Sequence, residues 1–443
     1  RVIQNQATLI GHEVGMGKTL TAIVAAMESK RLGFTRKSMF VVPNHTLVNW
    51  QAAMQVAYPG ANLLIPSPDD LSKGNRSVFL SRVATNEWDM ILVPFSSFKL
   101  LPASQQAKRE FISEQIAELE EYLEEEKASN RRKTQAQKDI EKALKRLEKK
   151  LKDMDQFEKD SEKTLTFEEL GIDLLVVDEF HAYKNLYFNT RMNRIAGLTN
   201  TDSQRAFDMF IKSQWLLKNG GKFVGMTGTP VTNTIAEMFT MQRYFQMDVL
   251  RSTGLHQFDA WARQFALAEP GLEMTPDGAG FRMNTRFRKF VNMSELMQMW
   301  LQVADMRRVD PAEIQRPDLY LGKPVKAVSF AGQELIDFTQ SLAQRAEKVR
   351  SGRVRPEEDN MLMITSDGRK AAADLSLVLP ASPNAEMPKV DGLTSLAALI
   401  REMTGAVRGT QLIFCDLGVP KARKEKKNDE EEETAVEVAV ETA

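Results

Sequence analysis

The sequence predicts an α/β fold in which a parallel sheet is covered by helices on both faces. Five short apolar segments, which begin near residues 7, 39, 89, 174 and 222, each end in a loop of polar residues. Helical stretches separate several of these segments, a spacing typical of parallel strands joined by crossover helices. In such a sheet the loops gather at the carboxyl ends of the strands, where ligands bind.

The bulk composition is that of a globular protein and excludes several classes. At 443 residues the chain is long enough for two or three domains. Lys and Arg number 59 against 60 Asp and Glu, so the chain is not basic throughout, although local basic grooves for nucleic acid remain open. The single cysteine, Cys415, excludes an intramolecular disulfide and a thiolate metal cage and fits a cytoplasmic setting. No apolar run reaches the length of a membrane span, so we expect no membrane partner.

The first strand leads into a glycine loop and a helix within GHEVGMGKTLTA, residues 11–22. Glycines on either side of Met16 allow backbone N–H groups to face a polyphosphate at the start of the helix. Lys18 can reach the β and γ phosphates, and the Thr19 hydroxyl can bind Mg²⁺. We therefore expect ATP and Mg²⁺ to bind at Gly15, Met16, Gly17, Lys18 and Thr19.

One residue departs from the strict phosphate-loop pattern. The pattern G-x-x-x-x-G-K-[ST] has a glycine where this chain has His12. A strand-to-helix turn that binds no nucleotide is the alternative when this segment is taken alone. The decision depends on whether later strands deliver the other groups that phosphoryl transfer needs.

The strand at residues 174–177 supplies two carboxylates, because it ends in the sequence DEFH. We expect Asp178 to bind Mg²⁺ through water and Glu179 to polarise the attacking water, since phosphoryl transfer depends on positioning and charge neutralisation. A strand end capped by acidic residues is the alternative for this stretch alone.

Polar loops follow the remaining strands. The loop TGTP at residues 227–230 has hydroxyls suited to linking the nucleotide state to a neighbouring lobe, and we expect this role for Thr227, Thr229 and Asn233. The loops after the strands near residues 39 and 89 could touch a sugar-phosphate backbone. Their candidate residues are Asn44, His45, Ser96 and Ser97.

In chain order, GHEVGMGKT, VVPNH, VDEFH and MTGTPVTN resemble motifs I, Ia, II and III of superfamily 2 helicases. TGTP followed by asparagine is most similar to the Swi/Snf-type branch of double-stranded DNA translocases. The segments FEELGIDLLVVDEFHAYKNL, EMFTMQRYF, FDAWARQFA, EDNMLMITSDGRKAA and QLIFCDL look like helicase modules of very large bacterial and phage proteins, often found beside an adenine-specific DNA methyltransferase. The resemblance covers most of residues 5–418.

This resemblance implies a RecA-like P-loop NTPase lobe that drives movement on double-stranded DNA with ATP. It implies that Lys18, Asp178 and Glu179 are catalytic and that Thr19 and Asp178 hold Mg²⁺. It also implies coupling between hydrolysis and DNA through His181, Thr227, Thr229 and Asn233.

Swi/Snf-type motors have a second RecA-like lobe, whose arginines complete the ATP site. Here TQLIFCDLGVPK resembles the first strand of that lobe, and a lysine block and an acidic run follow it. We therefore expect only the start of a second lobe and poor hydrolysis by the isolated chain. The resemblance implies a fused or separate second lobe as a partner, with a DNA methyltransferase as a further candidate.

Residues 105–160 are dense in Glu, Lys, Gln and Arg, with apolar residues at alternating spacings of three and four. This heptad seam predicts an antiparallel helical hairpin inserted in the first lobe. Its residues are Ile116, Leu119, Leu123, Ile140, Leu144, Leu147, Leu151 and Met154. The hairpin is either a solvated spacer or an arm that docks another domain or protein.

The segment GFRMNTRFRKF, residues 280–290, interleaves basic and aromatic residues. This composition is compatible with phosphate contact by Arg286 and Arg288, and an ordinary amphipathic surface strand or loop is the alternative. Residues 234–310 have a largely helical pattern. Further helices are predicted at residues 333–349 and 393–403, and a strand at 411–415.

The expected domain order is a first lobe in two parts, residues 1–104 and 161–310, around the insertion at 105–160. A connector with a helical segment follows at 311–390, then the start of a second lobe at 391–418 and a disordered charged tail at 419–443.

Three functions compete. The first is the ATP-binding lobe of a DNA-stimulated translocase in phage or mobile-element DNA metabolism. The second is a non-catalytic scaffold that keeps the motor fold and binds DNA or a partner, and the third is an RNA helicase. The complete set of Lys18, Asp178 and Glu179 favours the first over the second. TGTP disfavours the third, because RNA-directed helicases of the DEAD-box kind usually carry Ser-Ala-Thr there.

Overall fold

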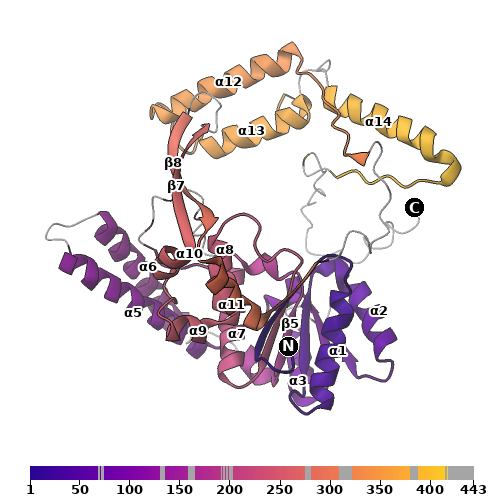
Figure 1. Cartoon of the computed structure of the whole chain (residues 1–443), viewed down its shortest axis with the longest axis vertical. Helices are drawn as coiled ribbons and strands as arrows, with labels where there is room; N and C mark the ends of the chain where they lie inside the picture. Colours follow the sequence, from indigo (N-terminus) through magenta and orange to yellow (C-terminus); the bar gives the residue numbers. More distant parts are fainter. Residues whose placement is uncertain are drawn as a thin grey trace. The chain divides into compact units, whose positions relative to one another are not determined.

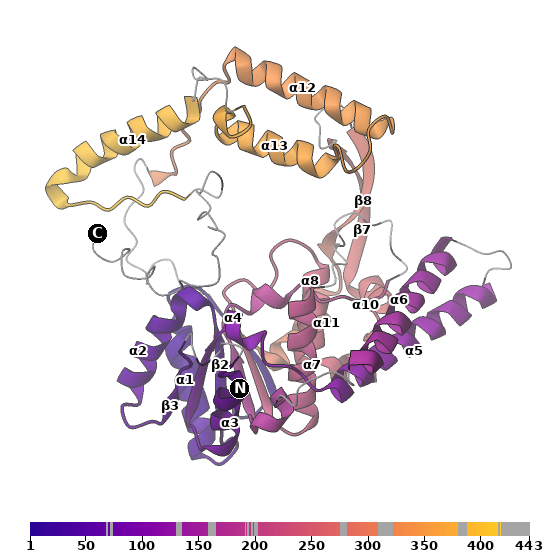
Figure 2. The same ribbon diagram turned by 180° about the vertical axis from the view of Figure 1, so that it is seen from behind.

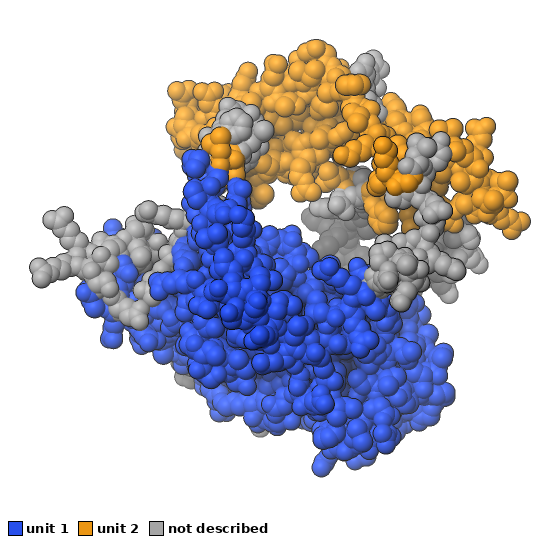
Figure 3. Space-filling model, viewed as in Figure 1, with its two compact units in different colours: residues 1–271, 283–315 blue, residues 272–282, 316–443 orange. Residues whose placement is uncertain are grey.

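A computed structural model describes residues 1–67, 70, 74–129, 135–157, 165–190, 192, 195, 198, 203–274, 281–308, 322–379, 388–414 and 417. The chain forms two compact units (Figure 3). Unit 1 comprises residues 1–271 and 283–315, and unit 2 comprises residues 272–282 and 316–443. The finer domain boundaries expected from the sequence stay predictions.

Unit 1 is built on a seven-stranded sheet in the order β3-β4-β2-β5-β6-β1-β9 (Figure 1). All neighbouring strands pair in parallel, which confirms the predicted fold class. The strands are β1 (Ala7–His12), β2 (Ser38–Val42), β3 (Leu63–Leu64), β4 (Met90–Pro94), β5 (Leu174–Val177), β6 (Lys222–Met226) and β9 (Ala304–Arg307).

Helices cover both faces of this sheet, because successive side chains of a strand point to opposite faces. On one face Ile10, Phe40 and Val176 pack with Ile23 and Trp50. The two helices of this face are α1 (Lys18–Arg31) and α2 (Leu47–Ala57).

The opposite face carries the larger core. Leu9, Val41 and Val177, each next in sequence to a residue of the first face, pack there with Phe79 and Phe210. The helices that contribute to this core are α3 (Arg76–Thr85), α7 (Gln204–Lys218), α8 (Ala236–Phe245), α10 (Phe258–Phe265) and α11 (Met293–Val303). Shorter elements are α4 (Phe95–Phe98), α9 (Met247–Ser252) and the 3₁₀ helices η1 (Asn44–Thr46), η3 (Phe167–Leu170) and η4 (Phe180–Tyr183).

The predicted hairpin is formed by α5 (Gln105–Ser129) and α6 (Gln135–Phe157), which lie side by side (Figure 2). Leu119 and Tyr122 of α5 are buried with Ile140 and Leu144 of α6. Three of these residues belong to the predicted seam, and Tyr122 does not. Asn130 of the expected turn and the side chain of Met154 lie outside the described residues.

The base of the hairpin belongs to the body of unit 1. Ile112 is buried with Phe207 and Ile211 of α7, and Leu147 and Leu151 pack against them. A solvated spacer joined only at its ends would not bury these residues. The hairpin is therefore anchored on α7, and its far end has a separate small core.

Three strands interrupt the largely helical pattern expected for residues 234–310, and one of them lies in the segment 280–290, where a strand was an alternative. β7 (Ala266–Met274) and β8 (Phe281–Phe290) form a two-stranded sheet, and β9 joins the edge of the main sheet. Phe287 packs on Phe258 of α10, with ring centroids 6.0 Å apart. Phe287 packs on the protein from one side of the strand, as expected where successive side chains point to opposite faces. The helical residues on either side obscured this alternation in the sequence.

Unit 2 contains α12 (Gln333–Arg350), α13 (Met361–Ala373), α14 (Pro388–Thr404) and the 3₁₀ helices η6 (Leu375–Leu377) and η7 (Gly405–Val407). The helices expected at residues 333–349 and 393–403 are thus present. The strand expected at 411–415 is not formed in its described part, where Leu412 and Phe414 are 78% and 91% exposed. A strand needs a hydrogen-bonding neighbour, and no strand of the described residues pairs with this segment. Cys415 and the charged tail lie outside the described residues.

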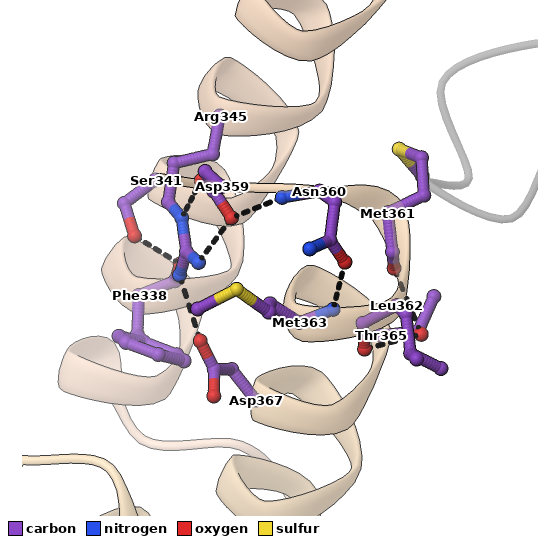
Figure 4. Close-up of polar contacts among 10 residues, drawn as sticks. All are labelled: Phe338, Ser341, Arg345, Asp359, Asn360, Met361, Leu362, Met363, Thr365 and Asp367. Atoms are coloured by element: carbon purple, nitrogen blue, oxygen red, sulfur yellow. Dashed lines mark hydrogen bonds and ion pairs between the residues drawn. The ribbon is translucent and has the colours of Figure 1, made fainter. Parts of the chain in front are cut away.

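An arginine clasp holds α12 to the start of α13 (Figure 4). Arg345 donates from Nε and Nη2 to both carboxylate oxygens of Asp359, at 2.7 and 2.9 Å, and from Nη1 to Asp367 at 2.9 Å. Asn360 caps α13 by accepting the N–H of Met363 at 3.0 Å. The hydrogen bonds from Arg345 lower the pKa of Asp359.

We expect Arg345→Met to weaken the pairing of α12 and α13 by about 1 kcal/mol at neutral pH, since the clasp is bidentate but partly exposed. The pKa of Asp359 is lowered in the folded state, so its stabilisation is complete above the unfolded pKa and is lost as pH falls through the folded one. Hydrogen exchange of α13 should therefore differ between the variant and the wild type at pH 7 and converge as the pH falls below about 4. Arg353→Met, an exposed neighbour, is the matched control; equal exchange in both variants would contradict the clasp.

Among the described residues, no helix has the length and apolar character that crossing a membrane requires.

Candidate nucleotide site

The sheet brings three of the predicted motif loops together. β6 lies between β5 and β1, and all three run in parallel, so the loops after them leave the same edge. Thr227 donates its N–H to the carbonyl of Ile10 at 3.1 Å. A Cβ on Gly228 would lie 3.5 Å from the carbonyl oxygen of His12 and 3.6 Å from the side chain of Val14. The loop after β6 therefore packs directly on the loop after β1.

The loop between β1 and α1 has the backbone that phosphate binding requires. Gly15 and Gly17 have φ of 90° and 72°, in the left-handed region that favours glycine. The space where their Cβ atoms would stand is open. Since the first N–H groups of a helix have no intrahelical partner, α1 presents free donors at Lys18 and Thr19. The dipole of α1 also places partial positive charge at this end of the helix, which favours a bound anion.

Lys18 is held at the mouth of this loop. Its Nζ donates to the carbonyl oxygens of His12 and Glu13, at 3.0 and 3.1 Å. Both acceptors are uncharged, so a phosphate would be the stronger partner for the ammonium group. Thr19, next to it, is partly buried at the start of α1.

Asp178 is fixed at the end of β5 by two N–H donors. Trp50 of α2 donates from Nε1 to Oδ2 at 3.0 Å, and the Glu179 backbone donates to Oδ1 at 2.9 Å. The Asp178 side chain is 8% exposed and its own N–H bonds to Val41 of β2. These bonds fix the orientation of the carboxylate, and each of its oxygens can accept further hydrogen bonds or a metal. No sequence motif indicated this role for Trp50, which is 128 residues away from Asp178.

Glu179 and His181 connect the end of β5 to the TGTP loop after β6. Nδ1 of His181 lies 3.1 Å from Oε2 of Glu179 and 3.1 Å from Oγ1 of Thr227. Thr227 is fully buried, and its Oγ1 accepts the N–H of Thr229 at 3.1 Å. A change at the Glu179 carboxylate can thus reach the TGTP loop through one imidazole.

Glu179 itself has an unusual backbone, with φ of 45° and ψ of 49°. This left-handed conformation costs a residue with a side chain about 1–2 kcal/mol. Strain of this kind at a loop edge is a feature of functional sites, where the surrounding structure fixes it.

A second connection, through Glu237 of α8, escaped the sequence analysis. Glu237 Oε2 accepts the N–H groups of Thr232 and Asn233, at 2.7 and 3.2 Å, and Oε1 lies 2.9 Å from Nζ of Lys184. Burial raises the pKa of Glu237, but these bonds outweigh it and the net pKa is lowered. The carboxylate therefore stays charged and joins the segment after DEFH to the segment after TGTP.

His12, the departure from the strict pattern, has its own partner. Its Nε2 lies 2.9 Å from Oδ2 of Asp305 on β9, and the His12 residue is 5% exposed. Burial raises the pKa of Asp305, and His12, Arg307 and Arg1 together lower it by more. The histidine side chain is thus used to fasten the end of β1 to the edge strand.

These groups fit ATP and Mg²⁺. Mg²⁺ takes few protein ligands and keeps several waters beside phosphate oxygens, which suits one hydroxyl, Thr19, and one carboxylate, Asp178. The described residues contain no cluster of three or more His, Cys, Asp or Glu that could cage a metal alone.

The four residues predicted to contact the DNA backbone differ in their exposure to solvent. Asn44 and Ser96 lie in η1 and α4, directly after the neighbouring strands β2 and β4, and Asn44 Nδ2 donates to Ser96 Oγ at 2.9 Å. His45 is exposed beside them. Ser97, also in the short helix α4, is only 5% exposed, whereas Ser96 is half-buried. Burial there argues against a phosphate contact by Ser97.

Arg286 and Arg288 lie on β8, away from these loops in sequence and on one face of the strand because they are two residues apart. Arg288 is exposed, and its guanidinium lies against Gly271 of β7, where a Cβ would meet it at 2.1 Å. Arg286 is partly buried. The strand alternative of the sequence analysis is thus the observed structure, and contact with phosphate stays a prediction.

The fold and the arrangement of its loops are those of a RecA-like P-loop domain. The model of the family described as probable helicase domain matches residues 1–308, and the chain belongs to this family. This membership confirms that the motifs described above are those of a helicase domain.

Comparison with known proteins gave further similarities. Defense against restriction protein B of Escherichia phage P1 is 26% identical over 277 residues, which are 54% of this chain and 12% of that protein. The chain thus spans a small part of this curated relative. The solved structure "Sulfolobus solfataricus SWI2/SNF2 ATPase core in complex with dsDNA" is 13% identical, with a TM-score of 0.35 over 91% of this chain and 61% of that one. The core domain of the same protein is also 13% identical, with a TM-score of 0.33 over 89% and 59%.

Proposed function

We propose that the chain is the ATP-binding motor lobe of a DNA-dependent ATPase, which couples hydrolysis to movement on duplex DNA when a second lobe completes it. The observation that carries this proposal is the convergence of the loops after β1, β5 and β6 in a chain of the helicase-domain family. These loops bear every group that ATP and Mg²⁺ need from one lobe.

In this proposal Lys18 binds the β and γ phosphates. The backbone N–H groups of the glycine loop and of the start of α1 donate hydrogen bonds to the phosphate oxygens. Thr19 and Asp178 would hold a Mg²⁺ ion, which would supply neutralisation of phosphate charge. Glu179 orients the water that attacks the γ phosphate and accepts its proton. His181 carries the change at Glu179 to Thr227.

DNA contact is proposed at the same edge of the sheet. Asn44 and Ser96 present neutral hydrogen-bonding groups, which suit a backbone contact without base preference. Arg286 and Arg288 of β8 would add charge. The name of the phage relative, defense against restriction, supports a role of the whole protein in phage or mobile-element DNA metabolism, where a DNA methyltransferase is a proposed partner.

Equilibrium binding measurements distinguish the proposed motor function from the scaffold alternative. The chain is titrated with a non-hydrolysable ATP analogue and Mg²⁺, and separately with labelled duplex DNA with and without the analogue. A motor lobe binds the analogue and changes its DNA affinity when it does so, since the loops of the two proposed sites follow neighbouring strands of one sheet, β5 and β2. A chain that binds DNA but no analogue is the scaffold, and tighter binding of duplex RNA than of duplex DNA would support the RNA helicase.

We expect Glu237→Gln to loosen the TGTP loop while leaving the analogue affinity within about twofold. A glutamine cannot pair with Lys184, and its amide faces N–H donors in place of an acceptor. Exchange of the Thr232 and Asn233 amides should rise about tenfold, and the effect of DNA on turnover should fall. Lys184→Met with the double variant forms a cycle, in which additive effects would contradict the proposed pair. Glu295→Gln, exposed on α11, is the control.

A further inference from the structure

A cavity of 1070 Å³ lies in unit 1, between α5 of the hairpin and helices α7, α8 and α9. None of the three nucleotide loops lines it. Asn5 and Gln6, which do, lead into the amino end of β1. The cavity thus lies toward the edge of the sheet opposite to the proposed ATP site, and the function proposed above does not account for it.

Arg243 is a buried cation in the wall of this cavity. It is 3% exposed, and its guanidinium lies 5.1 Å from the ring centroid of Phe210 and 5.8 Å from that of Phe239. Nη1 donates to the carbonyl of Tyr187 at 2.7 Å. No other acceptor of Arg243 is found among the described residues, so most of its five N–H groups are left for another partner.

Asn189 is the second buried polar group and has an unused acceptor. The residue is 3% exposed, and its Nδ2 makes two long contacts, at 3.4 Å to Gln115 and 3.5 Å to Glu118. Its Oδ1 is buried and has no hydrogen-bond partner among the residues that the structure describes. A buried unsatisfied acceptor costs about 1–3 kcal/mol, so a donor from outside the chain would recover this free energy.

The rest of the lining is aromatic in the wall and acidic overall. Five carboxylates face three cationic side chains among the residues that line the cavity. Glu110 and Glu114 of α5 pair with Lys218 and Arg251 across it, at 3.4 and 2.8 Å. Burial raises the pKa of Glu118, and Arg243 opposes this. The aromatic residues are Phe111, Phe188, Trp215, Phe245 and Phe258, besides the two rings at Arg243.

We propose that this cavity binds an extended peptide segment of a partner protein, with an apolar side chain next to a basic one. A peptide group offers a carbonyl to Arg243 and an N–H to Asn189 Oδ1, as no purely anionic or cationic ligand does. The aromatic wall receives the apolar side chain, and the excess of carboxylates attracts the basic one. The same excess repels phosphates, which disfavours nucleic acid. Since α5 forms one wall, the bound segment would engage the anchored base of the hairpin.

Fluorescence polarisation of the full chain tests this site with a fluorescein-labelled heptapeptide of alternating Lys and Leu. We expect saturable binding and a Kd that rises at least about fivefold in Asn189→Ala, the loss expected for one buried hydrogen bond. Glu118→Gln is the second variant in case the first is misfolded by circular dichroism. Glu120→Gln, exposed on the same helix and outside the cavity, should leave the Kd unchanged.

Three results would overturn the inference: no saturable binding, equal binding by folded Asn189→Ala, or equal binding of a peptide with Glu in place of Lys. Displacement of the probe by oligothymidylate, with tighter binding of the oligonucleotide, would reassign the site to nucleic acid. The test is independent of the proposed motor function, because Asn189→Ala should bind the ATP analogue as the wild type does.

Discussion

Lys18→Ala is expected to lower the affinity for a non-hydrolysable ATP analogue with Mg²⁺ by more than about 100-fold. Lys18 supplies the charge nearest to the β and γ phosphates, and its Nζ already lies at the loop mouth, 3.0 Å from the His12 carbonyl. Removing one partner of such a charge pair costs about 3 kcal/mol or more. Isothermal titration calorimetry of the purified chain measures the change directly.

Arg31→Ala is the matched control, because Arg31 is an exposed cation at the far end of the same helix and pairs with the partly exposed carboxylate of Glu28 at 2.7 Å. Its analogue affinity should equal that of the wild type. Unchanged affinity in Lys18→Ala would place any nucleotide elsewhere and favour the scaffold. Equal losses in both variants would show that α1 had been disturbed as a whole.

The main sheet could be predicted because its strands are local patterns. β1, β2, β4, β5 and β6 are continuous apolar runs followed by polar loops, and their burial on both faces needs no distant information. β3 has two residues, and only Ala304 of the four in β9 is buried, so neither carries a recognisable run. They are strands because a neighbour's backbone offers hydrogen bonds.

The same division applies to the candidate site. Lys18, Asp178 and Glu179 stand next to their strands, so sequence order places them at one edge. The groups that orient them do not: Trp50 and Glu237 come from α2 and α8, and Asp305 reaches His12 across 293 residues. The chain turns into α4 directly after β4, and Ser97 is buried there, which its position in the sequence did not indicate.

His12 shows how a motif departure can be explained only in three dimensions. A glycine at this position leaves space for the loop, and here the end of β1 carries a buried imidazole instead. Its partner Asp305 belongs to a strand that the sequence did not reveal. The loop between residues 13 and 17 keeps its glycine geometry, so the substitution alters the attachment of β1 and leaves the phosphate cradle open.

Glu179→Gln is expected to keep analogue binding and to lower hydrolysis by about 100-fold or more, since a proton acceptor typically contributes this much. The isolated chain turns over slowly in our proposal, so the measurement is conversion of radiolabelled ATP by excess protein over hours, with and without duplex DNA. Glu87→Gln, exposed after α3, controls for loss of one carboxylate. Hydrolysis that persists in Glu179→Gln would remove Glu179 from the proposed mechanism.

A glycine at the same position separates catalysis from folding. With φ of 45° Glu179 is strained, and glycine relieves this strain where alanine keeps it. Glu179→Gly should therefore have a free energy of unfolding about 1 kcal/mol higher than that of Glu179→Ala, as measured by denaturant titration. Both variants should lack hydrolysis. The ion pair lost with His181 is about 40% exposed on both sides and contributes little. If glycine instead destabilised the fold more than alanine does, the carboxylate's backbone position would be a structural requirement, and strain at Glu179 would no longer support a catalytic role.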